Sequence, residues 1–392
     1  MTLPLSHVTV VSLEQAIAAP LATRHLADLG ARVIKVERPG GGDFARHYDA
    51  AARGMSSHFA YVNRSKESIT LDLKAAEGKE ILARLLERAD VFVQNLAPGA
   101  VERLGFDDGR LRASYPDLIV CHVSGYGADG PYREKKAYDL LIQAETGVVS
   151  VTGSEETAAK SGIPVADIAG GMYAYSSILA ALLQRERGGE GCVLNVSLFD
   201  GLCDWMGFPA YYALGHDRLP RTGANHASIA PYGPYATGDG RTILFAIQNQ
   251  REWERFCASV LEKPEVASDS RFADNTQRVQ NRMALREEIE SIFSGLTVTE
   301  ATARMEQAQI ANAELRDVEA FWAHPQLVAR GRVAEVESQV GPLPALQPAT
   351  TSDEWPPRFD PIPAEGEHTR PLLDEFGYGS DEIEKLARDG VI

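Results

Sequence analysis

The fold is decided first by the segment His7-Val-Thr-Val-Val-Ser-Leu13, which is rich in β-branched residues and is predicted to be a strand. A helical pattern runs from Pro20 to Leu29, and Gly30 follows it as the C-terminal cap. A second strand, Arg32-Val-Ile-Lys-Val-Glu37, ends before Pro39 and three consecutive glycines. This unit predicts two parallel strands joined by a crossover helix.

The same alternation continues along the first 130 residues, and one more strand follows a later helix. Further strands are predicted at 68–73, 91–96, 118–123 and 192–197, and residues 75–88 carry a helical apolar stripe. Strands separated by helices of this length predict an α/β fold with a parallel, doubly wound sheet and helices on both faces. Ligands bind beyond the carboxyl ends of such strands, so the segment after each strand is a candidate site.

The chain changes character beyond about residue 220. Thr237-Gly-Asp-Gly240 separates two apolar runs and predicts a hairpin. Helical patterns at 250–261, 276–294 and 299–309 indicate a smaller α+β domain. The proline-rich segment 341–363 is predicted to be an extended linker without helix or strand.

Charge is distributed unevenly along the 392 residues, which carry 39 Lys and Arg against 55 Asp and Glu, a net charge of −16. Residues 1–140 contain 18 acids and 18 bases, whereas residues 351–392 contain 11 acids and 4 bases, so 4 − 11 = −7 lies in the tail. This acidity argues against nucleic-acid binding but leaves room for an anionic ligand in the neutral first part.

The amino terminus, the apolar runs and the cysteines indicate in which compartment of the cell the protein is located. The amino terminus lacks the pattern of a signal peptide, and no run approaches the roughly 20 apolar residues of a membrane span. The 4 cysteines are scattered, which fits a reduced compartment. We therefore expect a cytoplasmic protein that does not bind a membrane.

Familiar catalytic motifs give little guidance. Gly40-Gly-Gly42 follows a strand, but Asp43 and Phe44 come next, where a phosphate loop needs small residues. The motifs G-x-x-x-x-G-K-[ST], H-E-x-x-H, C-x-x-C and G-x-S-x-G are missing, and no metal site is predicted. His226 lies in a polar loop rich in small residues, so it is the histidine best placed to line a site.

Basic residues recur after the predicted strands. Each one alone is most simply a solvated surface charge. Parallel strands end at one edge of a sheet, so together these residues suit a ligand with several phosphates. The group comprises Lys35, Arg38, Lys74, Arg103, Lys135 and Lys136.

Asp167 is the most informative single residue. It lies in the apolar, glycine-flanked stretch Val165-Ala-Asp-Ile-Ala-Gly-Gly171, just before a helix predicted from Met172 to Arg187. The structural interpretation is an N-cap, a position that Asp favours. The functional interpretation is a nucleophile that forms a covalent acyl intermediate.

Taken together, these segments resemble the class III coenzyme A transferases, the family of formyl-CoA transferase and the carnitine and bile-acid CoA transferases. The similar motifs occur in order along nearly the whole chain. They are Ala18-Ala-Pro20, Leu29-Gly-Ala-Arg-Val-Ile-Lys-Val-Glu-Arg-Pro39, residues 63–74, residues 90–100, Gly125-Tyr-Gly127, Asp167-Ile-Ala-Gly-Gly171 and Gly366-Glu-His-Thr369.

The resemblance implies a fold and a site. The fold is a Rossmann-like large domain built from residues 1–220 and 331–392, a small α+β domain at 221–330, and an interlocked homodimer. Asp167 falls on the catalytic aspartate. The implied coenzyme-binding residues are Arg38, Lys74, Asn95, Leu96, Ala100, Arg103 and Lys136. The implied substrate-pocket residues are Gln15, Ala16, Tyr138, Asp139, Asn225 and His226.

The resemblance also implies a mechanism that needs no metal and no prosthetic group, with an acyl-CoA thioester as substrate. The Asp167 carboxylate attacks the thioester and forms a mixed anhydride and a CoA thiolate. The thiolate then forms an aspartyl-CoA thioester and releases the donor acid. An acceptor carboxylate then attacks the aspartyl-CoA thioester, and the same two kinds of step in reverse order give the new acyl-CoA and free Asp167.

Substrate choice follows from two local similarities. Gly223-Ala-Asn-His-Ala-Ser-Ile-Ala-Pro-Tyr232 and Gln143-Ala-Glu-Thr-Gly147 resemble members that use succinyl-CoA with mesaconate, itaconate, citramalate or glutarate. In that case Asn225 and His226 meet the distal carboxylate. The run of glycines typical of formyl-CoA transferases is missing, which argues against oxalate and formate.

Two alternatives stay open. The first is a 2-methylacyl-CoA racemase, whose His-Asp pair falls at Tyr138 and Asp139. Tyrosine lacks the acid and base role of imidazole near neutral pH. The second is a CoA-binding protein without catalysis.

Overall fold

The computed structural model describes residues 2–215, 219–350, 352–356 and 358–392. The chain forms two compact units. The large unit comprises Met1–Gly147, Ser161–Gly207 and Pro325–Ile392, and the small unit comprises Val148–Lys160 and Phe208–His324. The large unit is thus built from both chain ends. The boundaries between the two units lie at 207/208 and 324/325, whereas the sequence predicts domain boundaries at 220/221 and 330/331. The short earlier segment Val148–Lys160 also belongs to the small unit.

The large unit contains a six-stranded parallel sheet, which confirms the predicted α/β class. The strands are β1 (Thr9–Leu13), β2 (Arg32–Glu37), β3 (Lys66–Thr70), β4 (Val91–Gln94), β5 (Ile119–Ser124) and β6 (Val193–Ser197). Their order is β3-β2-β1-β4-β5-β6, and each neighbouring pair is parallel. This is the Rossmann order, in which the chain changes direction between β1 and β4.

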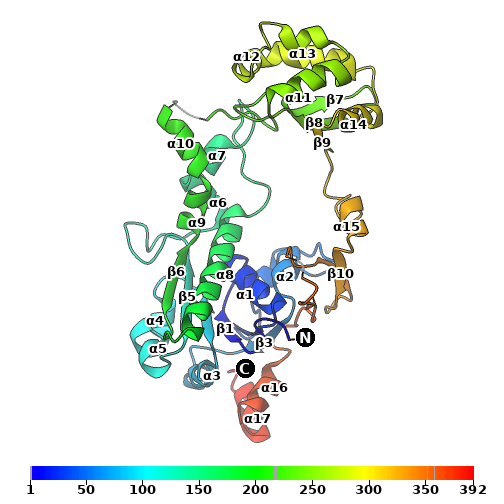
Figure 1. Cartoon of the computed structure of the whole chain (residues 1–392). Coiled ribbons are helices and arrows are strands. Elements are labelled where there is room, and N and C mark those ends of the chain that lie inside the picture. Colours follow the sequence, from blue (N-terminus) through cyan, green and yellow to red (C-terminus); the bar gives the residue numbers. More distant parts are fainter. Residues whose placement is uncertain (1, 216–218, 351, 357) are drawn as a thin grey trace. The chain divides into compact units, whose positions relative to one another are not determined.

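Helices cover both faces of this sheet (Figure 1). Alternate strand residues such as Val11, Ile34 and Phe92 share one core with α3, α4 and α5. On the other face, α1 and α8 pack against each other and against the strands. The bounds are α1 (Ala18–Asp28), α2 (Ser57–Val62), α3 (Ala76–Leu86), α4 (Ala100–Leu104), α5 (Asp108–Ser114), α6 (Asp139–Glu145), α8 (Val165–Glu186), α9 (Leu198–Trp205) and the 3-10 helix η1 (Phe44–His47).

Helix α8 begins earlier than predicted. It starts at Val165, after Pro164, so Asp167 lies inside its first turn and is not the N-cap. By length and composition alone, α8 is the one helix of the described residues that is apolar enough to cross a membrane, with a mean hydropathy of 1.3. It packs against α1, α6, α9, β5 and β6, and 44% of its apolar window is buried.

The end of the chain returns to the large unit. Helices α16 (Thr369–Glu375) and α17 (Ser380–Arg388) bury Leu372, Leu373 and Ile383 in the same core as α3 to α5. Before them lie α15 (Pro325–Ala329) and the antiparallel pair β10 (Val333–Val336) and β11 (Leu343–Leu346). The prediction of a linker without elements at 341–363 was therefore wrong at β11, because its residues pair with a strand that precedes the proline-rich segment.

The small unit has its own α+β core. Strands β7 (Tyr232–Ala236), β8 (Thr242–Ala246) and β9 (Ala311–Glu314) form an antiparallel sheet, and the predicted hairpin joins β7 to β8. Trp253, Phe245 and Phe293 are fully buried in its core. The predicted helix at 276–294 is two helices that meet at Asn281. The helices are α7 (Val148–Val151), α10 (Gly207–Gly215), α11 (Gln250–Arg255) with the π-helix η2 (Phe256–Val260), η3 (Pro264–Ser268), α12 (Asn275–Gln280), α13 (Arg282–Phe293) and α14 (Val298–Gln307).

Candidate active site

The loops that leave β1 and β4 meet where the sheet changes direction. Gln15 donates its backbone N–H to Asn95 Oδ1 at 2.8 Å, and Asn95 Nδ2 donates to the Gln15 carbonyl at 2.8 Å. Ligands bind at this crevice in doubly wound sheets. The structure therefore brings together two residues from the predicted coenzyme and substrate sites that are 80 positions apart in the sequence.

A buried charged network supports the loop after β1. Ala16 has a φ of 63°, and its N–H donates to Asp43 Oδ1 at 3.1 Å. Asp43 Oδ2 accepts from Lys35 Nζ at 2.8 Å, and Glu14 accepts from Lys66 Nζ at 2.7 Å. All four charged side chains are fully buried. Burial lowers the pKa of Lys66 to about 8, although the charge of Glu14 offsets part of the effect.

The network corrects one expectation about the basic group. Lys35 was predicted among the ligands of an anion, but its ammonium group is enclosed by Asp43 and Glu14 beneath the site. Lys135 is also engaged, by an ion pair with Glu145 and by the ring of Tyr132 at 4.2 Å. The enclosed ammonium group of Lys35 is not accessible to phosphates, and that of Lys135 already has an acidic partner.

The other four basic residues remain exposed at or near the carboxyl edge. They are Arg38, Lys74, Arg103 and Lys136. Within the described parts of the chain, none of them forms an ion pair with a carboxylate. A hollow of about 460 Å³ opens beyond β2 and β3, lined by Gly40, Thr70 and the segment 365–371. Arg38 directly precedes Pro39, which is one of the residues that line this hollow.

Asp167 is half-buried in the first turn of α8. Burial and the nearby carboxylate of Asp139 raise its pKa to about 7. These two effects outweigh the helix terminus, which favours an ionised carboxylate. Within the described residues, no hydrogen-bond donor is paired with the Asp167 side chain. An unpaired carboxylate with a pKa near neutrality is suited to act as a nucleophile.

Asp139 caps α8 in place of Asp167. Its Oδ1 accepts from the Ala166 N–H at 2.9 Å, and its Oδ2 accepts from Gln143 Nε2 at 2.7 Å. Both carboxylate oxygens are therefore committed to the local structure. Asp139 lies next to Asp167 but serves as a structural acceptor.

Two tyrosines belong to the surroundings of this site, because Asp167 and Tyr138 both act electrostatically on Tyr48. Tyr138 precedes α6 and is 66% exposed. Burial raises the pKa of Tyr48 to about 12, and the charges of Asp43, Asp167 and Tyr138 add to the effect, so Tyr48 lies near the candidate nucleophile. Sequence reasoning missed Tyr48, because it follows η1 in an irregular segment that matches no motif.

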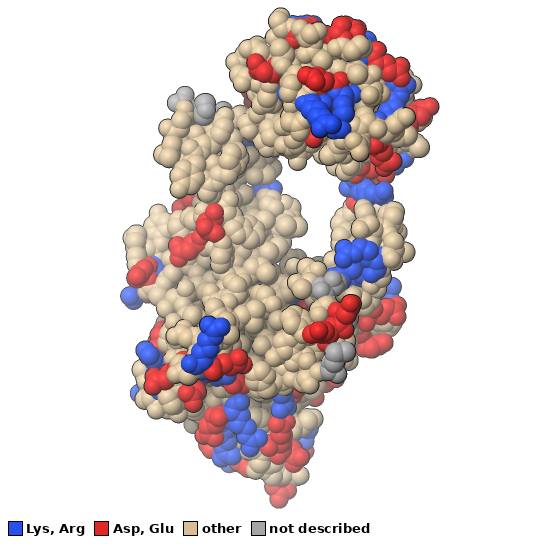
Figure 2. Space-filling model, viewed as in Figure 1, with Lys and Arg blue, Asp and Glu red and all other residues tan. Residues whose placement is uncertain are grey.

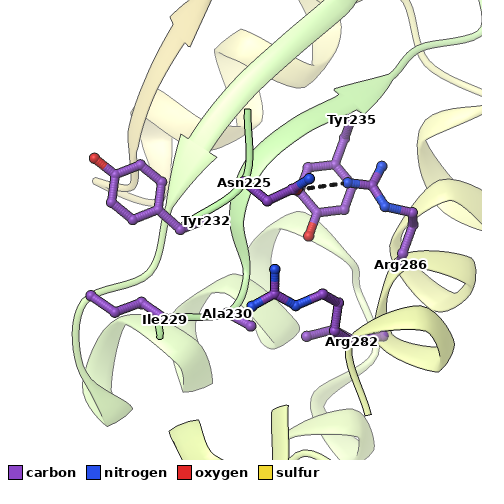
Figure 3. Close-up of a pocket in the computed structure, with 8 residues that line it drawn as sticks. Asn225, Ile229, Ala230, Tyr232, Tyr235, Arg282 and Arg286 are labelled. Atoms are coloured by element: carbon purple, nitrogen blue, oxygen red, sulfur yellow. Dashed lines mark hydrogen bonds between the residues drawn. The ribbon is translucent and has the colours of Figure 1, made fainter. Parts of the chain in front are cut away.

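Asn225 of the small unit lines a small pocket with Tyr235 and Arg286 (Figure 3), whereas His226 is not one of the lining residues. Asn225 Oδ1 accepts from Arg286 Nη2 at 3.0 Å, and its Nδ2 donates to the Thr222 carbonyl at 3.1 Å. The ring of His226 stacks on Tyr232 at 5.1 Å, and its Nδ1 accepts from the Ser228 N–H at 3.2 Å. Asn225 is thus committed to the loop.

The described residues contain no cluster of three or more His, Cys, Asp or Glu side chains arranged to hold a metal ion. The chemistry of the candidate site is that of one carboxylate with raised pKa and a group of exposed cations.

Known proteins resemble this chain over nearly its whole length. The family model described as CoA-transferase family III matches residues 5–371. The succinyl-CoA:glutarate CoA-transferase of Mus musculus is 34% identical, with 99% of this chain and 90% of that protein covered. The succinate–glutarate CoA-transferase of Agrobacterium fabrum is 34% identical over 98% of this chain and 97% of that protein. A crystal structure of a CAIB/BAIF family protein from Brucella suis matches with a TM-score of 0.84 and 32% identity, covering 96% and 100% of the two chains.

The chain belongs to CoA-transferase family III. It is a class III CoA-transferase, an enzyme whose substrates are an acyl-CoA and a carboxylic acid.

Proposed function

We propose that this enzyme transfers CoA from succinyl-CoA to a small dicarboxylate, with Asp167 as the nucleophile. The observation that carries the proposal is the half-buried, unpaired Asp167 carboxylate with its pKa raised to about 7. Two relatives named for succinate or succinyl-CoA and glutarate support the substrate pair. Glutarate is the first acceptor to test, followed by mesaconate, itaconate and citramalate.

The reaction proceeds through two kinds of enzyme intermediate. An Asp167 oxygen bonds to the thioester carbonyl carbon, the carbon–sulfur bond breaks, and the electron pair leaves with the CoA thiolate. The thiolate then attacks the Asp167 carbonyl and releases succinate, which leaves an aspartyl-CoA thioester. The acceptor carboxylate attacks the aspartyl carbonyl of this thioester, the carbon–sulfur bond breaks, and a new mixed anhydride and the CoA thiolate form. The thiolate then attacks the acyl carbonyl of this anhydride, and the bond between that carbon and the Asp167 oxygen breaks, which gives the new acyl-CoA and the free Asp167 carboxylate. No metal or prosthetic group enters these steps.

The coenzyme is proposed to lie along the carboxyl edge of the sheet. Arg38, Lys74, Arg103 and Lys136 would meet its phosphates, because they are exposed and have no acidic partner within the described residues. Asn95, Leu96 and Ala100 would line the same path, because they follow β4 at the crevice. Weaker CoA binding at higher ionic strength is the expected sign of such contacts.

The acyl groups are proposed to bind between the loop after β1 and the start of α6. Gln15 and Ala16 supply the first, and Tyr138 with Asp139 the second. His226 is proposed to meet the distal carboxylate. Its Nδ1 already accepts a hydrogen bond, so the neutral ring carries its proton on Nε2, where it can be donated. Asn225 is proposed to contribute through the same loop.

The active form is proposed to be an interlocked homodimer in the cytoplasm. Helix α10 has the sequence Gly-Phe-Pro-Ala-Tyr-Tyr-Ala-Leu-Gly and buries none of its residues in the single chain. Tyr211 is 78% exposed and Leu214 is 82% exposed. Figure 2 shows no charged side chain over α10. An apolar helix with no buried face needs a partner, and a second copy of this chain is the proposed one.

Racemase activity is the second candidate. It would use the pair Tyr138 and Asp139, but both oxygens of Asp139 are engaged by α8 and Gln143. Proton exchange α to the thioester, without a change of acyl group, would reveal it. A CoA-binding protein without catalysis would show neither reaction.

The test is a transfer assay with succinyl-CoA and each dicarboxylate, in which new CoA esters are separated and identified. Asp167→Ala and Asp167→Asn are expected to lose transfer by at least about 1000-fold, because no nucleophile remains. Asp129→Asn, at an exposed loop position, is the matched control and should match wild type. Full activity of Asp167→Asn would refute the nucleophile, and no transfer to any dicarboxylate would refute the substrate class.

A further inference from the structure

A chain of hydrogen bonds ends at the backbone of Leu96. Gln94, the last residue of β4, lies directly opposite His122 of β5. Gln94 Nε2 and His122 Nδ1 are 2.7 Å apart, and His122 Nε2 lies 2.7 Å from Asp108 Oδ1 at the start of α5. On the other side, Gln94 Oε1 accepts from the Leu96 N–H at 2.8 Å. The chain therefore runs Asp108, His122, Gln94, Leu96.

The donors and acceptors allow one arrangement of protons. The Leu96 N–H can only donate, so the atom of Gln94 that faces it must be the amide oxygen. The Gln94 amide nitrogen then donates to His122 Nδ1, which must be unprotonated. The remaining proton of the neutral ring lies on Nε2 and is donated to the Asp108 carboxylate. Every donor and acceptor in this series of hydrogen bonds has a partner only when the protons are arranged in this way.

The same turn is held on its other side. The side chain of Asn95 exchanges two hydrogen bonds with the backbone of Gln15 in the loop after β1. The Asn95 N–H donates to the Leu13 carbonyl at 3.2 Å. The His122 side chain is 15% exposed, so water has limited access to its contact with Gln94. The backbone at 95 and 96 is therefore held from the side of both strands that neighbour β4, namely β1 and β5.

We propose that Gln94, His122 and Asp108 are positioning residues that hold the Leu96 backbone in the conformation that binds coenzyme A. This inference rests on the proposed coenzyme site, because Leu96 is one of its residues. The three side chains act through Leu96 and do not touch the reacting atoms. A turn that is already ordered loses no further conformational entropy when the coenzyme binds. The series of hydrogen bonds from Asp108 through His122 and Gln94 to Leu96, called the relay here, therefore strengthens coenzyme binding.

The test compares coenzyme affinity with catalysis. Free coenzyme A is titrated calorimetrically into wild type, Gln94→Leu, His122→Phe and the double variant, and transfer kinetics are measured on the same proteins. Gln94→Leu and His122→Phe are each expected to raise the Kd about fivefold to tenfold, the value of one lost hydrogen bond. The kcat should stay within about twofold, because Asp167 is untouched.

Two comparisons separate positioning from a general loss of structure. Tyr115→Phe removes a 3.0 Å hydrogen bond to Ala83 in the same core, outside the relay, and should leave the Kd unchanged. The double variant should bind coenzyme A no more weakly than Gln94→Leu alone, because the relay is already broken. Additive effects, or equal effects in Tyr115→Phe and Gln94→Leu, would overturn the inference.

A measurement on wild type covers the case in which the variants do not fold. Nitrogen-15 NMR of labelled histidines should find His122 with its proton on Nε2, and a proton on Nδ1 would overturn the relay. Failure of wild type to bind coenzyme A would refute the proposed coenzyme site, and the inference with it. Binding by wild type with an unchanged Kd in Gln94→Leu would refute the inference alone.

Discussion

Replacing Asp167 with Asn should stabilise the protein, and the gain should depend on pH. Its pKa is raised from 3.8 to about 7, a difference of about 3 units, which corresponds to an upper limit of about 4 kcal/mol at 1.36 kcal/mol per unit. Solvent screens a half-buried group, so we expect about 2 kcal/mol at pH 8. A gain in stability on loss of activity is typical of a group whose burial serves function.

The sign follows from proton binding. Between pH 3.8 and about 7 the native state holds this proton more tightly than the unfolded chain, so wild-type stability falls as the pH rises through this window. Asn carries no such proton, and its advantage should shrink to less than about 1 kcal/mol at pH 4. Urea unfolding of both proteins at pH 4 and pH 8 measures the difference. An advantage equal at both pH values would refute the raised pKa.

Three further predictions concern activity, the buried network and assembly. The kcat/KM of wild type should rise with pH through about 7, and Asp139→Asn should move this midpoint to lower pH, because it removes a like charge and keeps an acceptor for the α8 cap. Lys35→Met should cost about 3 to 5 kcal/mol in denaturant unfolding, because Asp43 loses its buried partner, whereas the exposed Lys385→Met should cost almost nothing. Leu214→Asp should weaken the proposed homodimer in sedimentation experiments, since this side chain is 82% exposed in the single chain; a dimer that the substitution leaves unchanged would contradict a role for α10.

The sheet was predictable from sequence because its signals are local. Each strand is a short β-branched run bounded by glycine, proline or a helix, and parallel pairing follows from the helices between them. The meeting of Gln15 with Asn95 then follows from topology, because both come directly after neighbouring strands.

Features that depend on distant partners were not predictable. The structural interpretation of Asp167 is an N-cap, but the acceptor for the first turn of α8 is Asp139, which lies 27 residues before its donor Ala166. Lys35 was grouped with phosphate ligands, but its partners Asp43 and Glu14 come from other elements and enclose it. A strand pattern shows that Lys35 belongs to a strand without showing which acids surround it.

The return of the chain end to the sheet bears on how the protein is made. Thr70 at the end of β3 and Thr369 at the start of α16 bond to each other although they are 299 residues apart. At about 5 to 20 residues per second, a ribosome needs roughly 15 to 60 s to synthesise the chain between them. During that time the apolar core later covered by α16 and α17 stays exposed on the nascent chain. This part of the core is therefore open to aggregation until α16 and α17 have emerged.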